Sequence, residues 1–196
     1  MKTRVSLASV IILGFSACAQ NTQPGSPATA SGNPTAASQA AHQAAGVKWQ
    51  VPSRWTTVPP RPMRVATYRI PAAPGDSEDA ECAAYFFGPG QGGTVAANLT
   101  RWASQFQLPD FKPARAQQSE RTIAGLKVHT MSVSGTYLAV AGPMSPVEEK
   151  KPGYSMLGAI VEAPEGLVFF KLTGSAKTVA RALPEFNALL ESLKPC

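Results

Sequence analysis

Hydrophobic residues alternate with small or polar ones in six stretches of the chain, with the period of two that is typical of β-strands. Two pairs of these stretches are separated by short turns, Ala124-Gly125 and Pro164-Glu165-Gly166, so each pair forms a hairpin with antiparallel strands. The six predicted strands are 63–70, 80–87, 119–123, 126–139, 154–163 and 167–173, and 141–153 is expected to be a loop.

Two other stretches have hydrophobic residues at a helical period. In 94–106 the apolar positions are Val95, Leu99, Trp102 and Phe106. A second helix, capped by Ser175, reaches about residue 193, with an apolar stripe of Val179, Leu183, Phe186, Leu190 and Leu193. Pro184 is expected to kink or split this helix. The predicted fold class is α+β: an antiparallel sheet of about six strands with two amphipathic helices packed on it.

The N-terminus is typical of an export signal. Lys2 and Arg4 precede an apolar run, 5–15, which is too short to span a membrane. Phe15-Ser16-Ala17-Cys18 resembles a bacterial lipobox, with Phe15 where Leu is usual. We therefore expect 1–17 to be a signal peptide and Cys18 to carry fatty acyl chains such as palmitate. The alternative is an ordinary signal peptide that happens to contain a cysteine.

The next segment has the composition of a tether. Residues 19–46 contain no charged, aromatic, Val, Leu or Ile residue, so they cannot bury enough apolar surface to offset the entropy of ordering. We expect residues 18–46 to be the lipidated cysteine with a disordered tether, and 47–196 to be a single α+β domain. Trp49 and Trp55 open this domain and belong either to its core or to a sugar-stacking surface.

The charge balance is mildly basic, with 18 Lys and Arg against 12 Asp and Glu. An exported protein does not meet nucleic acid, so none is expected as a partner. We expect a location in the bacterial cell envelope, with the domain in the periplasm. Ala19 stands where an Asp favours inner-membrane retention in some bacteria, which slightly favours the outer membrane.

A glycine-rich turn between a predicted strand and a predicted helix is the strongest chemical motif. The stretch from Gly88 to Gly93 matches the spacing G-x-G-x-x-G, but the antiparallel hairpins that follow do not fit a dinucleotide-binding fold. A weaker interpretation is an anion site at the helix N-terminus, formed by Gly90, Gly92, Gly93 and Thr94. The alternative is a tight turn that needs glycine for a positive φ.

Cysteine and histidine offer few candidates for chemistry. With Cys18 lipidated, Cys82 and Cys196 remain as a candidate disulfide, and otherwise Cys82 is buried and Cys196 is free. His129 is the single histidine of the predicted domain and lies within a strand. No nucleophile motif accompanies it, so we expect no enzyme, no metal and no cofactor.

Four acidic residues lie close together in Asp76-Ser77-Glu78-Asp79-Ala80-Glu81. They do not match a calcium-binding loop, and a solvated loop is the simpler interpretation.

Three runs of residues together resemble a group of uncharacterised bacterial exported proteins and lipoproteins. They are Glu81-Cys82 through Phe86-Phe87-Gly88 to Arg101-Trp102, then 153–162, then Phe169-Phe170-Lys171-Leu172-Thr173-Gly174, and the resemblance covers about residues 49–193. The order of elements in this group is similar to the PsbP-like fold. The resemblance implies a protein-binding or assembly role and brings no catalytic residues.

Three hypotheses for function follow. The first is a membrane-anchored, non-enzymatic envelope lipoprotein that binds another envelope protein, and exposed aromatic residues on one sheet face would favour it. The second is a small-anion or small-ligand binding protein, which a basic pocket at the glycine turn would favour. The third is an enzyme, for which His129 would have to lie beside a carboxylate in a cleft.

Overall fold

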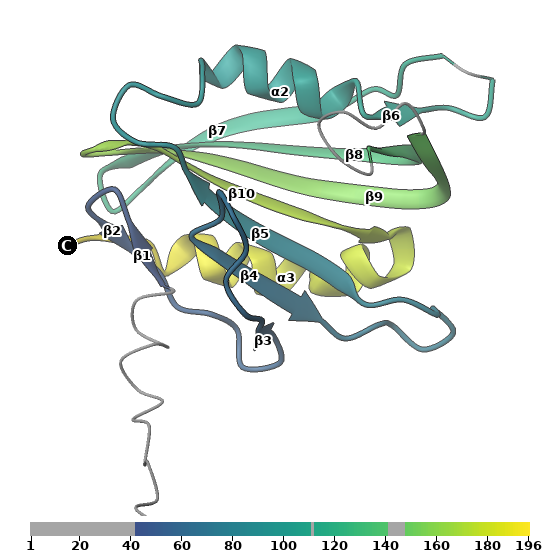
Figure 1. Cartoon of the computed structure of the whole chain (residues 1–196), viewed down its shortest axis with the longest axis horizontal. Helices are drawn as coiled ribbons and strands as arrows, with labels where there is room; N and C mark the ends of the chain where they lie inside the picture. The colour runs from purple at the N-terminus through teal and green to yellow at the C-terminus, as the bar shows by residue number, and fades with distance from the viewer. Residues whose placement is uncertain (1–41, 111, 141–147) are drawn as a thin grey trace, which may run out of the picture. The chain divides into compact units, whose positions relative to one another are not determined.

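The domain is built around one antiparallel sheet of eight strands with a helix on each face (Figure 1). The computed structural model describes residues 42–110, 112–140 and 148–196. The strand order is β3-β4-β5-β10-β9-β8-β6, and β7 pairs with β8. The strands are β3 (Thr56–Thr57), β4 (Ala66–Ile70), β5 (Ala80–Phe86), β6 (Phe106–Gln107), β7 (Gln117–Ile123), β8 (Leu126–Val140), β9 (Glu148–Ala163) and β10 (Gly166–Ser175).

All six predicted strands are present, as β4, β5, β7, β8, β9 and β10. The sheet is nevertheless larger than the predicted six strands, because β3 and β6 extend its edges. A further three-stranded sheet pairs β1 (Gln43–Ala44), β2 (Val47–Lys48) and β11 (Lys194–Pro195). These added strands have two residues each, which is too short to show alternation in the sequence.

Strand β9 begins six residues earlier than predicted. Residues 148–151 pair with the end of β8, so the prediction of a loop is wrong for these residues. The first part of the predicted loop, 141–147, lies outside the described residues. The register shifts between Gly135 and Tyr137, where Pro152 and Gly153 stand in the opposite strand. A proline has no N–H to give to a neighbouring strand, which explains a bulge at this point.

The face of the sheet that carries α3 (Ala176–Glu191) holds the larger core. Ser175 caps this helix by accepting a hydrogen bond from the backbone N–H of Thr178. The helix continues through Pro184 as one element, so it is not split. Its buried residues pack with alternate residues of β4, β5, β9 and β10, among them Tyr68, Ile70, Cys82, Val161, Phe170, Leu172, Val179, Phe186 and Leu190.

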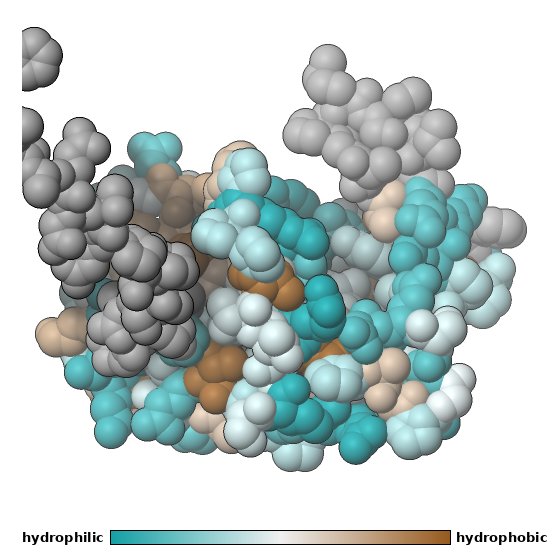
Figure 2. All heavy atoms as spheres, turned by 60° about the horizontal axis from the view of Figure 1, so that its bottom comes forward, coloured by the Kyte–Doolittle hydropathy of each residue, from teal (hydrophilic) through white to brown (hydrophobic). Residues whose placement is uncertain are grey.

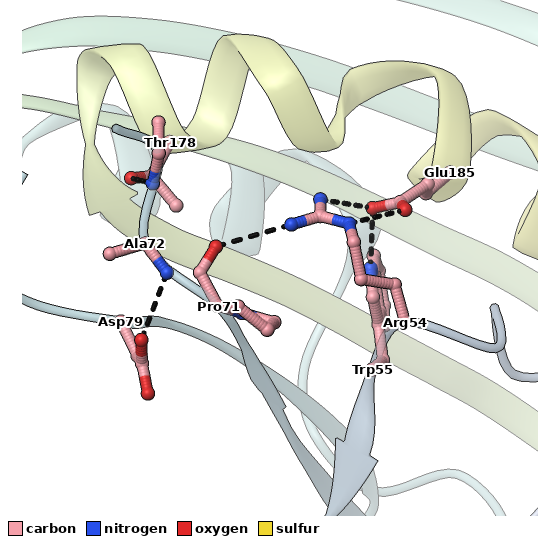
Figure 3. Close-up of polar contacts among 8 residues, drawn as sticks. Arg54, Trp55, Pro71, Ala72, Asp79, Thr178 and Glu185 are labelled. Carbon is pink, nitrogen blue, oxygen red and sulfur yellow. Dashed lines mark hydrogen bonds and ion pairs between the residues drawn. The ribbon is translucent and has the colours of Figure 1, made fainter.

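The segment before β4 also belongs to this core. Trp49 and Trp55 are 4% and 5% exposed, which confirms core packing rather than a sugar-stacking surface. Arg54 donates to both oxygens of Glu185 on α3, at 2.7 and 2.6 Å, and the Trp55 indole N–H donates to the same carboxylate at 2.8 Å (Figure 3). This cluster fastens the segment to the helix.

The domain begins earlier than the sequence predicts. Residues 43–44 form β1, and Ala45 is 5% exposed and belongs to the core. Residues 42–46 are therefore part of the fold and not of a tether, although their composition gave no sign of it. Pairing with β2 and packing against Pro164 at Gly46 supply the order that their side chains lack.

The surface on the side of α3 is mostly hydrophilic, and hydrophobic residues show only as separate spots where the grey atoms do not cover it (Figure 2). Among the described residues the large exposed hydrophobic side chains are Met63, Leu108 and Leu183. Scattered apolar residues of this kind are ordinary on a protein surface.

The opposite face carries the shorter helix α2 (Val95–Ala103), which lies across the sheet at the top of Figure 1. Thr94 caps this helix by accepting from the N–H of Ala97. The helix ends at Ser104, before the predicted residue 106, because Phe106 pairs with Tyr137 of β8. Leu99 and Trp102 cover Met131, Ile160 and Phe169 and form a second, smaller core. In the described part of the chain, no helix is long and apolar enough to cross a membrane.

Candidate functional site

Part of the sheet face that carries α2 is not covered by the helix. We call this part the open face and define it by Arg64, Glu81, Tyr85, Tyr137, Tyr154 and Lys171, which line a shallow pocket of about 300 Å³. Strand alternation places them there, because Tyr85 and Lys171 follow the same side of β5 and β10 as Phe87 and Phe169 of the smaller core.

Three tyrosines dominate the open face, and each is only partly buried. The rings of Tyr137 and Tyr154 stack at 6.2 Å with an angle of 9° between their planes. The guanidinium of Arg64 lies 5.7 Å from the centre of the Tyr85 ring, and the Lys171 ammonium lies 5.3 Å from that of Tyr137. The tyrosines therefore carry cations on their ring faces.

Ion pairs border the open face. Arg64 pairs with Glu81 at 2.7 Å, and Lys151 pairs with Glu78 at 3.2 Å. The Tyr154 hydroxyl also donates to Glu78, and this hydrogen bond together with Lys151 lowers the pKa of the Glu78 carboxyl. These exposed pairs orient the side chains around the tyrosines and contribute little to stability.

Lys171 is the unusual residue of this surface. Its ammonium donates to the Gln105 side chain at 2.6 Å and lies 3.4 Å from the Tyr137 hydroxyl. The pKa of Lys171 is lowered to about 8, mainly by burial and also by the nearby Arg101 and Arg64, while Glu81 acts in the opposite direction. A lysine held in this way is costly for the fold, which is a common property of functional positions.

One signal for Lys171 is present in the sequence. In Phe169-Phe170-Lys171-Leu172 a charged residue stands inside an otherwise apolar strand. Alternation puts Lys171 on the side of Phe169, but its neighbours Gln105 and Tyr137 come from elements far along the chain. The open face was therefore missed because it exists only in the assembled sheet.

The glycine turn has a packing role. A Cβ at Gly92, where φ is +88°, would lie 2.9 Å from the Phe87 ring and 3.1 Å from the Phe169 ring. The Asn98 side chain donates to the carbonyls of Gly92 and Thr94. Gly90, Gly92 and Gly93 all have positive φ, as a tight turn needs. The turn joins Gly90, Gly92, Gly93 and Thr94 in one loop, and the anion site proposed there stays a prediction.

The two described cysteines are free, so the candidate disulfide does not form in this structure. Cys82 is 0% exposed in the middle of β5, between Tyr68 of β4 and Leu172 of β10. Cys196 is exposed after β11 and donates its N–H to the carbonyl of Gly46. Cys82 lies in the eight-stranded sheet, whereas Cys196 follows the last strand of the three-stranded sheet. The sequence alone does not show this difference in position. Cys18 lies outside the described residues.

The acidic side chains of the run 76–81 accept hydrogen bonds from separate parts of the fold. Asp76 accepts from the hydroxyls of Ser175 and Thr178, and these two hydrogen bonds lower the pKa of its carboxyl. Asp79 accepts from the backbone N–H of Ala72 (Figure 3). Each acid turns to a different partner, and no group of three metal-ligating side chains occurs within the described ranges.

His129 lies on the α2 side of the sheet, away from the open face. Its Nδ1 is 3.1 Å from Glu120 and its Nε2 is 2.7 Å from Glu162, while Lys127 approaches both carboxylates at about 4 Å. The histidine therefore has the carboxylate neighbours that the third hypothesis requires, in the form of a charged cluster between β7, β8 and β9.

No protein-family model matches this chain, and no characterised relative matches it. Solved structures do. The chain is similar to LpqN of Mycobacterium tuberculosis, a protein involved in cell envelope biogenesis, with 12% identity over 76% of this chain and 82% of that one and a TM-score of 0.48. It is similar to PA94 of Pseudomonas aeruginosa, a protein of unknown function and putative regulator, with 13% identity, coverage of 74% and 99%, and a TM-score of 0.46.

The chain is also similar to the cyanobacterial PsbP of Synechocystis, with 12% identity over 77% of this chain and 87% of that one and a TM-score of 0.45. A PsbP protein and a protein involved in cell envelope biogenesis are thus among the structures that this chain resembles. What those proteins do is not transferred to this chain.

Proposed function

We propose that this protein is a lipid-anchored envelope protein whose domain binds another envelope protein through the open face. The N-terminal signal and Cys18 support export and anchoring, and the folded domain starting at His42 supplies the binding surface. In this proposal the domain acts by binding and not by catalysis.

The observation that carries the proposal is the group of three partly exposed tyrosines among arginine and lysine, on the part of the sheet face that α2 leaves uncovered. Tyrosine and arginine are enriched at the energetic centres of protein interfaces, because they offer a large apolar area together with hydrogen-bonding groups. On the α3 side, by contrast, hydrophobic residues are exposed only singly (Figure 2).

Site-specific photo-crosslinking in the native envelope tests this function. A photoreactive phenylalanine analogue replaces Tyr154 of the full chain, and the matched control carries it at Lys194, which is exposed on β11. We expect one discrete adduct with an envelope protein from position 154 and none from position 194. Equal adducts from both positions, or none from 154 and none from a second probe at Tyr137, would contradict the proposal.

Anchoring is tested separately. Cys18→Ser removes the thiol that would receive the lipid, so we expect the protein to leave the membrane fraction while the domain keeps its melting temperature. If Cys18→Ser stays in the membrane fraction as fully as the parent chain, lipid attachment at this residue is wrong.

A further inference from the structure

A second pocket lies beside the open face, where the end of α2 meets β5 and β10. It has a volume of about 180 Å³. Its apolar wall consists of the rings of Phe87, Trp102 and Phe169, and its polar wall carries Arg101 and Lys171. Lys171 lines both pockets, so the two are neighbours. We call the small pocket the niche.

The two cations of the niche have no carboxylate partner in the described part of the chain. Lys171 contacts the neutral groups of Gln105 and Tyr137, and Arg101 contacts the amide oxygen of Asn98. The segments outside the described ranges, 1–41, 111 and 141–147, contain no Asp or Glu. No acidic side chain of those segments can therefore neutralise these cations.

Most other cations near this surface are neutralised. Arg61 and Arg64 pair with Glu81, and Lys151 pairs with Glu78. Removing a charge from water without a counter-charge is expensive, so the contrast with the largely desolvated Lys171 is informative, and the exposed Arg101 adds a second unpaired charge beside it. The niche holds positive charge that an anion from outside would neutralise.

The glycine turn shapes the apolar wall of the niche. The missing side chain of Gly92 lets the rings of Phe87 and Phe169 meet with their centres 5.6 Å apart, and Trp102 meets Phe169 edge to face at 6.3 Å. This wall offers a surface for a flat or short apolar group, and the charged donors that would hold an anion lie on the polar wall, at Arg101 and Lys171.

We propose that the niche binds a carboxylate carried on a small apolar group, with the carboxylate at Lys171 and Arg101 and the apolar part against the three rings. The planar Arg101 guanidinium suits a carboxylate, to which it can donate two parallel hydrogen bonds. The volume is below the range of roughly 300–1,000 Å³ that holds whole drug-sized ligands, so it suits one side-chain-sized group.

This chemistry has two sources: an acidic or C-terminal residue of the proposed partner, or a free small acid. The first source rests on the proposed function, and the second does not. The niche itself can be tested without the partner.

The test uses benzoate as the probe and neutral benzamide, which has the same shape, as its control. Binding to the full chain is followed by saturation-transfer NMR. We expect saturable benzoate binding in the millimolar range and no binding of benzamide. Lys171→Met should weaken benzoate binding by about tenfold or more, which is the effect of losing a charge-assisted hydrogen bond. Lys194→Met, far along the chain on β11, should leave it unchanged.

Two further measurements keep the test decisive. Arg101 is exposed, so Arg101→Gln folds even if Lys171→Met does not, and it should also weaken benzoate binding. Benzoate should bind more weakly at pH 9 than at pH 7 in the parent chain, because Lys171 loses its proton near pH 8, whereas Lys171→Arg should bind equally at both. Equal binding of benzoate and benzamide would contradict the proposal that the niche binds a carboxylate. Benzoate binding that is unaffected by both Lys171→Met and Arg101→Gln would contradict it too.

Competition distinguishes the two sources. If benzoate in excess removes the crosslink formed from position 154, the carboxylate comes from the partner. If the crosslink persists while benzoate occupies the niche, the ligand is a free acid. If neither position 154 nor position 137 gives a crosslink and benzoate still binds, the proposed partner-binding function is wrong and the niche stands.

Discussion

The two faces of the sheet are built differently. The face under α3 is covered by a sixteen-residue helix and by the segment around Trp49 and Trp55, and its core is continuous. The face under α2 is covered by a nine-residue helix, and the rest of it carries tyrosines and charged groups. We infer that the face under α3 supplies the stability that allows the face under α2 to keep a half-buried lysine without a carboxylate partner among the described residues.

The largest loss of stability is expected from removing a large side chain from the α3 face. Phe170 is 0% exposed and meets Trp49 edge to face at 5.0 Å. Phe170→Ala should lower the free energy of unfolding by about 3–5 kcal/mol, measured by chemical denaturation. Tyr154→Ala on the open face is the matched change and should cost less than about 1 kcal/mol. Similar losses for both variants would show that the two faces contribute equally.

A second change acts on the junction between α2 and the sheet. Gly92→Ala places a Cβ against Phe87 in a backbone conformation with positive φ, so it should cost about 2–3 kcal/mol. Gly90→Ala is the control, because φ there is +68° but no atom lies within 4 Å of the added Cβ. It should cost about 1 kcal/mol. Equal losses in thermal unfolding would mean that the contact with the rings is unimportant.

The hydrogen bonds from Arg54 and Trp55 to Glu185 on α3 give a third prediction. Glu185→Ala leaves the Trp55 indole N–H without its acceptor and leaves Arg54 with only the carbonyl of Pro71, so it should cost about 1–2 kcal/mol. The hydrogen bond from Arg54 lowers the pKa of Glu185 below its usual value of 4.5. A lowered carboxyl pKa stabilises the fold above pH 4.5, and this contribution is lost as the pH falls through the folded-state pKa.

The pH dependence provides the check. The difference in unfolding free energy between the parent chain and Glu185→Gln should shrink as the pH is lowered from 7 into the acid range. A difference that stays constant with pH would show that charge at Glu185 is irrelevant and that shape alone matters.

The smallest expected effect has the opposite sign. Burial lowers the pKa of Lys171 to about 8 from 10.5, so the fold pays for the charged form below pH 8. Lys171→Met should therefore raise the free energy of unfolding by about 1 kcal/mol at pH 7. The charged and titratable groups around this ammonium are Arg64, Glu81, Tyr85, Arg101 and Tyr137.

The sign of the pH effect follows from proton binding. Between pH 8 and 10.5 the unfolded chain holds the Lys171 proton and the folded protein does not, so the stability of the parent chain rises with pH. The advantage of Lys171→Met should shrink over this range in thermal melts. If the stability difference between Lys171→Met and the parent chain grows with pH, or if Lys171→Met is less stable than the parent chain at pH 7, charged Lys171 does not destabilise the fold.

The sequence predicted those elements whose signal is local. Alternation found the six long strands, and the helical stripe of Leu99 and Trp102 found α2. The short strands β3 and β6 were missed because two residues have no period, and the start of β9 was missed because Glu148 to Lys151 are charged. Residues 42–46 were assigned to a tether because their order comes from β2 and Pro164 and not from their own side chains.

The candidate site was harder to predict for the same physical reason. The glycine motif drew attention to Gly90, Gly92 and Gly93, whereas the niche lies beside the rings that Gly92 supports. Lys171, Arg101 and Tyr137 come from three elements far apart in sequence. Only the register of β8, β9 and β10, together with the packing of α2 on the sheet, brings them together, and register is a property of the whole sheet.

The small sheet has a consequence for how the chain can be rearranged. Strand β2 pairs with β1 on one side and with β11 on the other, and the Cys196 N–H donates to the Gly46 carbonyl at 2.9 Å. The beginning and the end of the folded unit therefore lie side by side. A short peptide could join them and the chain could be opened at the Pro164-Glu165-Gly166 turn, giving a circular permutant with new ends. The architecture does not depend on where the polypeptide starts.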